Sequence, residues 1–230
     1  WHYDEPRHVA LRVLVELDPE AEAAKASEAE KARALATLRG SDIPGFFPTP
    51  DALADRMAEL AELQPGDVVG DTGAGIGSLL LAALRGQPEL GAAIGYECNP
   101  TLAAYLSEHV DGPSGGKITT FCRDSLAGEL ADRPDVVLIN PPYEKLQHLD
   151  HIRKAHDWCK RRVVALVPAN VRDLYESDNE RRAKVSEWVD WLRQIDTTAG
   201  GCISWEEVDP AAFQKSDAFR QAGGSTVVLT

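Results

Sequence analysis

The stretch "DVVGDTGAGIGSLLLAALRG", residues 67–86, decides the fold. It begins with a short apolar run that ends in an acid, as a buried β-strand does, and residues 78–86 carry Leu and Ala in a helical pattern. Glycines at positions 73, 75 and 77 lie between them and allow a tight turn that a ligand can approach closely. Backbone N–H groups at the start of the following helix point toward such a ligand. The stretch therefore predicts a ligand site at the carboxyl end of a strand.

Strands and helices alternate along the rest of the chain. Strands are expected at 67–71, 92–97, 117–124, 135–140, 162–169, 202–209 and 224–230, and helices at 78–86, 101–109, 148–160 and 180–194. This alternation predicts an α/β fold with a doubly wound, seven-stranded, mostly parallel sheet of the Rossmann-like type. Ligands on such sheets bind beyond the carboxyl ends of the strands, near the point where the strand order reverses.

The first 42 residues differ from this pattern and are expected to form an N-terminal extension to a domain over 43–230. Apolar residues alternate over 9–17, which predicts a short strand. Asp18 and Pro19 then favour the start of a charged helix that ends at Arg39, before Gly40.

Composition limits the classes of function. The net charge is −13, which disfavours tight binding to nucleic acid, but residues 144–193 hold 11 Lys/Arg against 9 Asp/Glu. No apolar run is long enough to span a membrane, so no membrane partner is expected. The four cysteines are scattered, which argues against a metal site and against disulfides and suits the cytoplasm.

Two acids end the strands that follow the glycine loop. Glu97 comes about 20 residues after the last glycine, where an acid commonly accepts protons from the ribose hydroxyls of a nucleotide. Asp124 ends the next strand, where it could accept a proton from an adenine amino group. The alternatives are a surface acid at Glu97 and a cap of the next turn at Asp124.

The fourth strand ends in an unusual corner, "DVVLINPPYEK", residues 135–145. Proline lacks an N–H group and biases the preceding residue toward extended conformations, so Asn140 to Tyr143 should be stiff. The alternative interpretation is a rigid turn in which Asn140 caps the following helix.

At this point the chain resembles the class I S-adenosylmethionine-dependent methyltransferases that act on an exocyclic or amide nitrogen. The resemblance covers roughly residues 43–230 and rests on "FFPTPDALADRM" (46–57), "DTGAGIG" (71–77), "YECNP" (96–100), "RDSL" (123–126) and "NPPY" (140–143). The carboxyl half is similar to small adenine-type methyltransferases of phages and prophages. The family's fold, which the resemblance implies here, has an antiparallel last strand.

The resemblance also implies roles for particular residues. The corner Asn140, Pro141, Pro142 and Tyr143 is expected to be catalytic. The cofactor S-adenosyl-L-methionine is expected to contact Phe46, Phe47, Thr49, Pro50, Asp71, Thr72, Gly73, Gly75, Gly77, Glu97, Cys98, Asp124, Ser125 and Asn140.

The corner has a chemical rationale in this family. The amino group of adenine is a poor nucleophile, because its lone pair is delocalised into the ring. If the Asn140 side-chain oxygen and the Pro141 carbonyl each accept one of its hydrogens, the nitrogen is drawn toward a tetrahedral state. Tyr143 would stack on the flat target.

The target is expected to be N6 of adenine in DNA, with Lys145, Arg172 and Tyr175 as contacts because they follow strand ends in the least acidic part of the chain. DNA-specific relatives usually carry a separate target-recognition domain, and none is expected after the last strand. The same chemistry on RNA or on a protein glutamine, and a partner subunit that recognises the target, are therefore the alternatives.

Overall fold

The computed structural model describes residues 19–39, 41, 43–176, 183–209 and 226–230. The chain divides into two units, Trp1–Asp42 and Ile43–Thr230. In the first unit the expected helix is present as α1 (Pro19–Arg39), and its described side chains are mostly exposed. The strand expected over 9–17 lies outside the described residues. No helix among the described residues is long and apolar enough to span a membrane.

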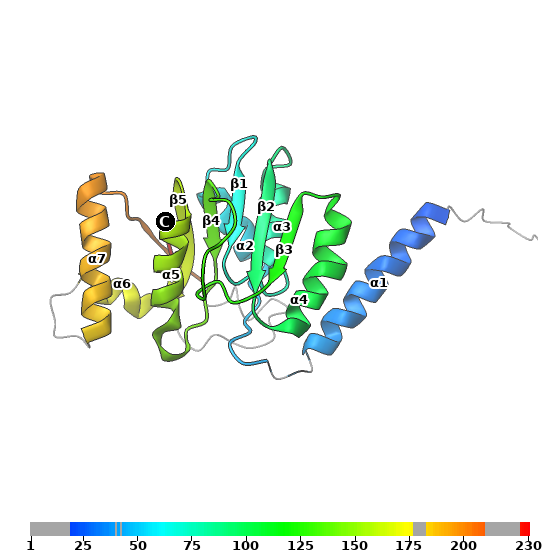
Figure 1. Ribbon diagram of the computed structural model, residues 1–230, viewed down its shortest axis with the longest axis horizontal. Helices are drawn as coiled ribbons and strands as arrows, with labels where there is room; N and C mark the ends of the chain where they lie inside the picture. Colours follow the sequence, from blue (N-terminus) through cyan, green and yellow to red (C-terminus); the bar gives the residue numbers. More distant parts are fainter. Residues whose placement is uncertain (1–18, 40, 42, 177–182, 210–225) are drawn as a thin grey trace, which may run out of the picture. The chain divides into compact units, whose positions relative to one another are not determined.

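The second unit is built on one sheet with the strand order β3-β2-β1-β4-β5-β7-β6 (Figure 1). The strands are β1 (Val68–Asp71), β2 (Ala92–Glu97), β3 (Ile118–Cys122), β4 (Val136–Ile139), β5 (Arg162–Pro168), β6 (Trp205–Val208) and β7 (Thr226–Leu229). Strands β1 to β5 are parallel, which confirms the predicted α/β class. Strand β7 pairs antiparallel with both β5 and β6. The strand order reverses between β1 and β4, so these two strands flank the switch point.

Three helices connect parallel strands: α3 (Ser78–Gly86), α4 (Pro100–Leu106) and α5 (Gln147–Trp158). Helix α2 (Asp51–Leu60) precedes β1, and α6 (Ala169–Glu176) and α7 (Ala183–Ala199) lie between β5 and β6. In Figure 1, α5 lies in front of the sheet, and α2 and α3 lie behind it. Helix α4 continues into a π-helical turn (Ser107–Asp111), and for this reason the expected helix over 101–109 changes geometry at its end.

Helix α6 was not predicted from the sequence. It begins at Ala169, directly after Pro168 ends β5, so no turn residue marks the boundary between strand and helix. Helix α2 also follows a proline, Pro50, which precedes its first residue. Helix α2 leads from the segment that contacts Asn140 to the start of β1, and α6 leads away from the end of β5.

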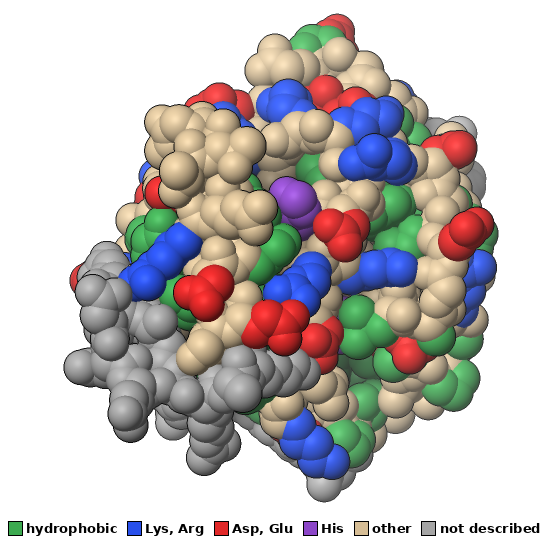
Figure 2. Space-filling view, turned by 60° about the vertical axis from the view of Figure 1, so that its left-hand side comes forward, with side chains coloured by type: hydrophobic (Ala, Val, Ile, Leu, Met, Phe, Trp, Pro, Cys, Tyr) green, Lys and Arg blue, Asp and Glu red, His purple; other side chains and the backbone are tan. Residues whose placement is uncertain are grey.

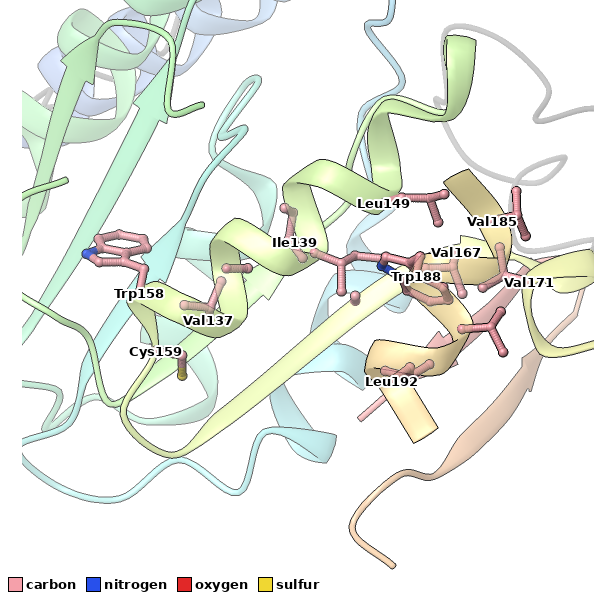
Figure 3. Close-up of a cluster of buried hydrophobic side chains, with 14 of the residues drawn as sticks. Val137, Ile139, Leu149, Trp158, Cys159, Val167, Val171, Val185, Trp188 and Leu192 are labelled. Atoms are coloured by element: carbon pink, nitrogen blue, oxygen red, sulfur yellow. The ribbon is translucent and has the colours of Figure 1, made fainter. Parts of the chain in front are cut away.

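The core on one face of the sheet joins β4 and β5 to α5 and α7. Figure 3 shows Val137 and Ile139 of β4, Val167 of β5 and Trp188 of α7 among side chains that converge in one cluster. Trp158, at the end of α5, lies against β1: a Cβ added to Gly70 would come within 2.7 Å of its ring. The bare backbone of Gly70 therefore permits the close approach of α5 to the sheet.

Candidate active site

A cavity of about 760 Å³ lies beyond the carboxyl ends of β1, β2 and β4. Most of the residues expected at a cofactor site line it: Phe46, Phe47, Thr49, Asp71, Thr72, Gly73, Gly75, Glu97, Cys98, Asp124, Ser125 and Asn140. The lining also includes Pro142 from the corner. Segments that are far apart in the sequence meet here because parallel strands present their carboxyl ends at one edge of the sheet.

The glycine loop follows β1 and forms one wall. Gly75 and Gly77 have φ of +57° and +83°, a left-handed conformation that favours glycine. A Cβ added to Gly73 would meet nothing within 4 Å, so the backbone there is open to a ligand. Gly77 does not line the cavity: a Cβ there would lie 3.1 Å from Leu106 and Val110, so Gly77 permits close helix packing instead.

Asp71 is almost completely buried at the end of β1, with 1% of its surface exposed. Its Oδ1 accepts a hydrogen bond from the Gly73 N–H at 2.9 Å, and its Oδ2 has no hydrogen-bond partner among the described residues. The neighbouring hydroxyl of Thr72 also has none there. Unpaired buried polar atoms are rare in native proteins, so this pair indicates a site that a ligand group completes. Burial and the nearby Glu97 raise the pKa of Asp71 to about 7, against the opposing effect of the Gly73 hydrogen bond.

Glu97 ends β2 and is buried rather than on the surface, contrary to the alternative interpretation. Its two carboxylate oxygens accept hydrogen bonds from the N–H groups of Gly75, at 2.9 Å, and Asn99, at 2.7 Å. Burial raises the pKa of Glu97, and these two hydrogen bonds oppose the shift. Glu97 thus fixes the glycine loop to the end of β2.

The residues that follow β3 hold the third side of the cavity. Asp124 is exposed and lines the cavity, and its Oδ1 accepts the Leu126 N–H at 2.9 Å, as the capping alternative describes. Ser125 is buried, and its hydroxyl donates to the Thr72 carbonyl at 2.7 Å. Ser125 therefore ties the end of β3 to the end of β1 through its only hydroxyl.

Asn140 directly follows β4, and its carboxamide is held on both sides. Its Nδ2 donates to the Phe47 carbonyl at 2.9 Å and to the Thr49 hydroxyl at 3.1 Å, and its Oδ1 accepts the Tyr143 hydroxyl at 3.2 Å. The side chain therefore caps no helix, and the capping alternative is wrong for Asn140. Burial raises the pKa of Tyr143, whose ring stands edge-on to His148 at 5.9 Å.

The chain after the corner is sharply bent. Lys145 and Leu146 have φ of +50° and +62°, which is uncommon for residues other than glycine. Consecutive left-handed residues of this kind cluster at functional sites, where surrounding structure compensates their cost. The bend directs α5 back along the sheet and leaves Lys145 exposed beside the corner.

Solved structures of several methyltransferases are similar to this chain in fold. No protein-family model matches the chain, and no curated protein matches it in sequence. The methyltransferase subunit of a type I restriction-modification system from Streptococcus thermophilus has a TM-score of 0.61 at 18% identity, over 82% of this chain and 45% of that chain. A candidate modification subunit of a type I restriction enzyme from Vibrio vulnificus YJ016 has a TM-score of 0.64 at 15% identity, over 94% and 50%. TYW2 of M. jannaschii, solved with AdoMet, has a TM-score of 0.50 at 20% identity, over 77% and 72%.

The chain has the fold of these methyltransferases. It spans about half the length of the two restriction-modification chains.

Several predicted residues lie elsewhere in this methyltransferase fold. Pro50, Pro141 and Tyr143 are next to lining residues but do not line the cavity themselves. Arg172 and Tyr175 lie on α6 and do not line it either. Arg172 pairs with Glu207 at 3.0 Å, and the Tyr175 hydroxyl donates to Asp196 at 2.9 Å. These contacts tie α6 to β6 and α7, and their expected role as target contacts remains a prediction.

Among the lining residues that the sequence did not predict are three that follow the corner: Glu144, Gln147 and His151. Gln147 and His151 are four positions apart in α5 and so lie on the same face of the helix. Burial lowers the pKa of His151, although Asp124 and Asp150 oppose this. Helical periodicity applied to α5 is the one signal that could have found them.

The charge of the cavity is one-sided. Asp71, Glu97, Asp124 and Glu144 line it, and no Lys or Arg does so among the described residues. A cavity with four carboxyl groups favours a ligand with positive charge over an anion.

Proposed function

We propose that this protein transfers the methyl group of S-adenosylmethionine to an exocyclic amino nitrogen, with N6 of adenine in DNA as the acceptor. The observation that carries the proposal is the orientation of Asn140 at the mouth of the cavity. Its NH₂ group is bound by Phe47 and Thr49, so its oxygen is the end of the carboxamide left for an incoming amino group.

The cavity fits S-adenosylmethionine. The unpaired Oδ2 of Asp71 and the hydroxyl of Thr72 suit the ammonium end of the cofactor, and the open backbone at Gly73 leaves room beside them. Glu97 can accept protons from the ribose hydroxyls, and Asp124, which is exposed and lines the cavity, can accept a proton from the adenine amino group. Four carboxyl groups without Lys or Arg among the described lining residues suit a ligand with a net positive charge. When bound, the cofactor supplies an electrophilic methyl group on a sulfonium ion.

Asn140 and Pro141 would activate the acceptor. Their two oxygens each accept one hydrogen of the amino group, which draws its lone pair out of the planar ring system. Acceptors held in place before reaction need no reorganisation, and one such dipole contributes roughly 3 kcal/mol to the transition state. Proline has no N–H group that could donate to a neighbouring acceptor, and its stiff backbone keeps the Pro141 carbonyl in place.

Tyr143 would hold the flat acceptor by stacking, as expected for a base turned out of a duplex. Lys145 follows it, exposed and on a strained turn, and is the described cation next to the corner in sequence. We assign it the phosphate contact adjacent to the target.

DNA is favoured as the polymer because two of the similar structures are restriction-modification methyltransferase subunits. Their names as subunits support a partner that supplies target recognition. The same chemistry on RNA or a protein glutamine is the second candidate. The lack of Lys and Arg among the described cavity residues favours the protein target over either nucleic acid, since phosphate groups gain no partner there.

Transfer of a tritiated methyl group tests the proposal. Double-stranded DNA, total RNA and cell-extract protein are offered in parallel at low salt, with Asn140→Ala as the control for background. Label in DNA, recovered as N6-methyladenine after digestion, supports the first candidate. Label in RNA or protein alone supports the second, and no transfer to any of the three contradicts the proposal.

A further inference from the structure

Thr49 lies in a segment that connects the two halves of the proposed site. The segment 43–50 precedes α2, and Phe46 stands over the glycine loop: a Cβ added to Gly75 would lie 3.6 Å from its ring. At the same time a Cβ added to Gly45 would lie 3.4 Å from Cβ of Pro142. The segment thus contacts the cofactor loop on one side and the catalytic corner on the other.

The orientation of the Asn140 carboxamide depends on this segment. The terminal torsion of asparagine is broad and nearly two-fold, so neighbouring groups must decide which way the amide points. A rotation by 180° would present the NH₂ group to the target, and two donors would then face each other. In the flipped state Oδ1 would also face the Phe47 carbonyl, which is a repulsive contact between two acceptors.

Two groups contact Nδ2 in the productive orientation, and one of them is a side chain. The Phe47 carbonyl can only accept and so selects this orientation, and the Thr49 hydroxyl, which can also donate, adds a second hydrogen bond that restricts the torsion. The Phe47 carbonyl, at 2.9 Å, belongs to the backbone and is present whatever the residue. The Thr49 hydroxyl, at 3.1 Å, is a side-chain acceptor for the second hydrogen of Nδ2, and Thr49 is 6% exposed, so little water is available to replace it.

We propose that Thr49 is a positioning residue that fixes the carboxamide of Asn140 with its oxygen toward the methyl acceptor. This inference rests on the proposed function and changes the role expected for Thr49, from a contact of the cofactor to a partner of Asn140. It also explains how the cofactor side of the cavity sets the geometry of the acceptor side, because one segment contacts both.

The test compares Thr49→Val with Thr49→Ser. Valine keeps the shape and removes the acceptor, so kcat should fall about tenfold, while the Kd for S-adenosylmethionine changes less than about twofold. Serine keeps the hydroxyl and should restore most of kcat. Thr119→Val is the matched control, because Thr119 is exposed on β3. Thr49→Ala serves as a second variant if the valine protein does not fold.

A second readout does not depend on activity. The side-chain NH₂ resonances of Asn140 are identified by their loss in Asn140→Ala. In Thr49→Val they should shift and exchange faster with solvent, and in Thr49→Ser and Thr119→Val they should resemble the wild type.

The outcomes distinguish a failure of the role inferred for Thr49 from a failure of the proposed function. Unchanged kcat and unchanged Asn140 resonances in Thr49→Val would overturn the inference, as would a loss of cofactor affinity as large as the loss of kcat. If the wild type transfers no methyl group to any polymer but the resonances respond as described, the proposed function fails and the positioning contact stands.

Discussion

The hydroxyl of Tyr143 donates a hydrogen bond to Oδ1 of Asn140 at 3.2 Å. This oxygen is the atom proposed to accept the target amino group. A carbonyl oxygen has two lone pairs, so it can accept the target and keep Tyr143, or the tyrosine can turn away. Either way the hydroxyl occupies the acceptor before the target arrives, while the ring provides the surface on which the target would stack.

The first prediction separates the ring from the hydroxyl. Tyr143→Phe should retain much of kcat and KM for the polymer, because stacking needs only the ring, and losing the hydroxyl frees Oδ1. Tyr143→Ala should lose both rate and polymer binding, since base–aromatic stacking is worth about 1–3 kcal/mol. Steady-state methyl transfer with each variant measures the difference. A phenylalanine variant as inactive as the alanine variant would mean that the hydroxyl itself takes part in transfer.

The second prediction concerns Glu97. Glu97→Ala removes the acceptor proposed for the ribose and also frees the N–H groups of Gly75 and Asn99. Losing one charge-assisted hydrogen bond costs about 1.5–3 kcal/mol, so the Kd for S-adenosylmethionine should rise roughly ten- to a hundredfold. Calorimetric titration measures this, with thermal unfolding as a check on the loop. Wild-type affinity in the variant would remove the ribose assignment.

The sequence predicted the parts of the site that depend on strand ends. Asp71 and Glu97 end parallel strands and Asn140 directly follows one, and the topology of such sheets brings those ends together. The local sequence pattern was sufficient there, because the position of a strand and the residue at its end can both be predicted from residues that are neighbours in the chain.

The contacts around Asn140 could not be predicted in the same way. Thr49 lies 91 residues before it in the chain, and no periodicity relates a loop residue to a strand end at that distance. Gly77 stays a prediction as a cofactor residue, but it is not among the residues that line the cavity. A glycine that a ligand needs and a glycine that helix packing needs look identical in sequence, and only the structure shows how close position 77 lies to Leu106 and Val110.

The third prediction links pH to both stability and cofactor binding through Asp71. Its pKa is raised to about 7 by burial first and by Glu97, whereas an unfolded aspartate has a pKa of about 3.9. Between these values the folded state holds a proton that the unfolded chain has lost, so stability falls as pH rises through this window. Asp71→Asn lacks this penalty, and its melting temperature relative to the wild type should rise from pH 5 to pH 8.

Cofactor affinity should respond in the opposite direction. Only the ionised Asp71 attracts an ammonium group, so wild-type affinity should increase as pH rises through 7, and Asp71→Asn should bind more weakly without that dependence. The titration of the cofactor itself is common to both proteins and cancels in the comparison. Parallel pH profiles in the two proteins would show that Asp71 does not meet the cationic end of the cofactor.

The last prediction tests whether α6 contacts DNA. Figure 2 looks onto the side of the molecule that carries α7, where Lys and Arg are interspersed with Asp and Glu rather than gathered in one basic patch. Arg172→Glu removes the ion pair with Glu207, which is 3.0 Å long. It should lower transfer to DNA by more than the loss of this ion pair explains only if Arg172 contacts phosphate. Arg85→Glu is the matched control, because Arg85 pairs with Asp55 at 2.6 Å and lies on α3. Exposed ion pairs contribute at most about 1 kcal/mol, so both reversals should have similar small effects on stability.

We expect Arg172→Glu to raise KM for DNA severalfold more than Arg85→Glu. The slope of log affinity against log salt concentration should also become shallower, by the amount that corresponds to about one phosphate contact. Equal effects on KM would mean that Arg172 serves only to join α6 to β6.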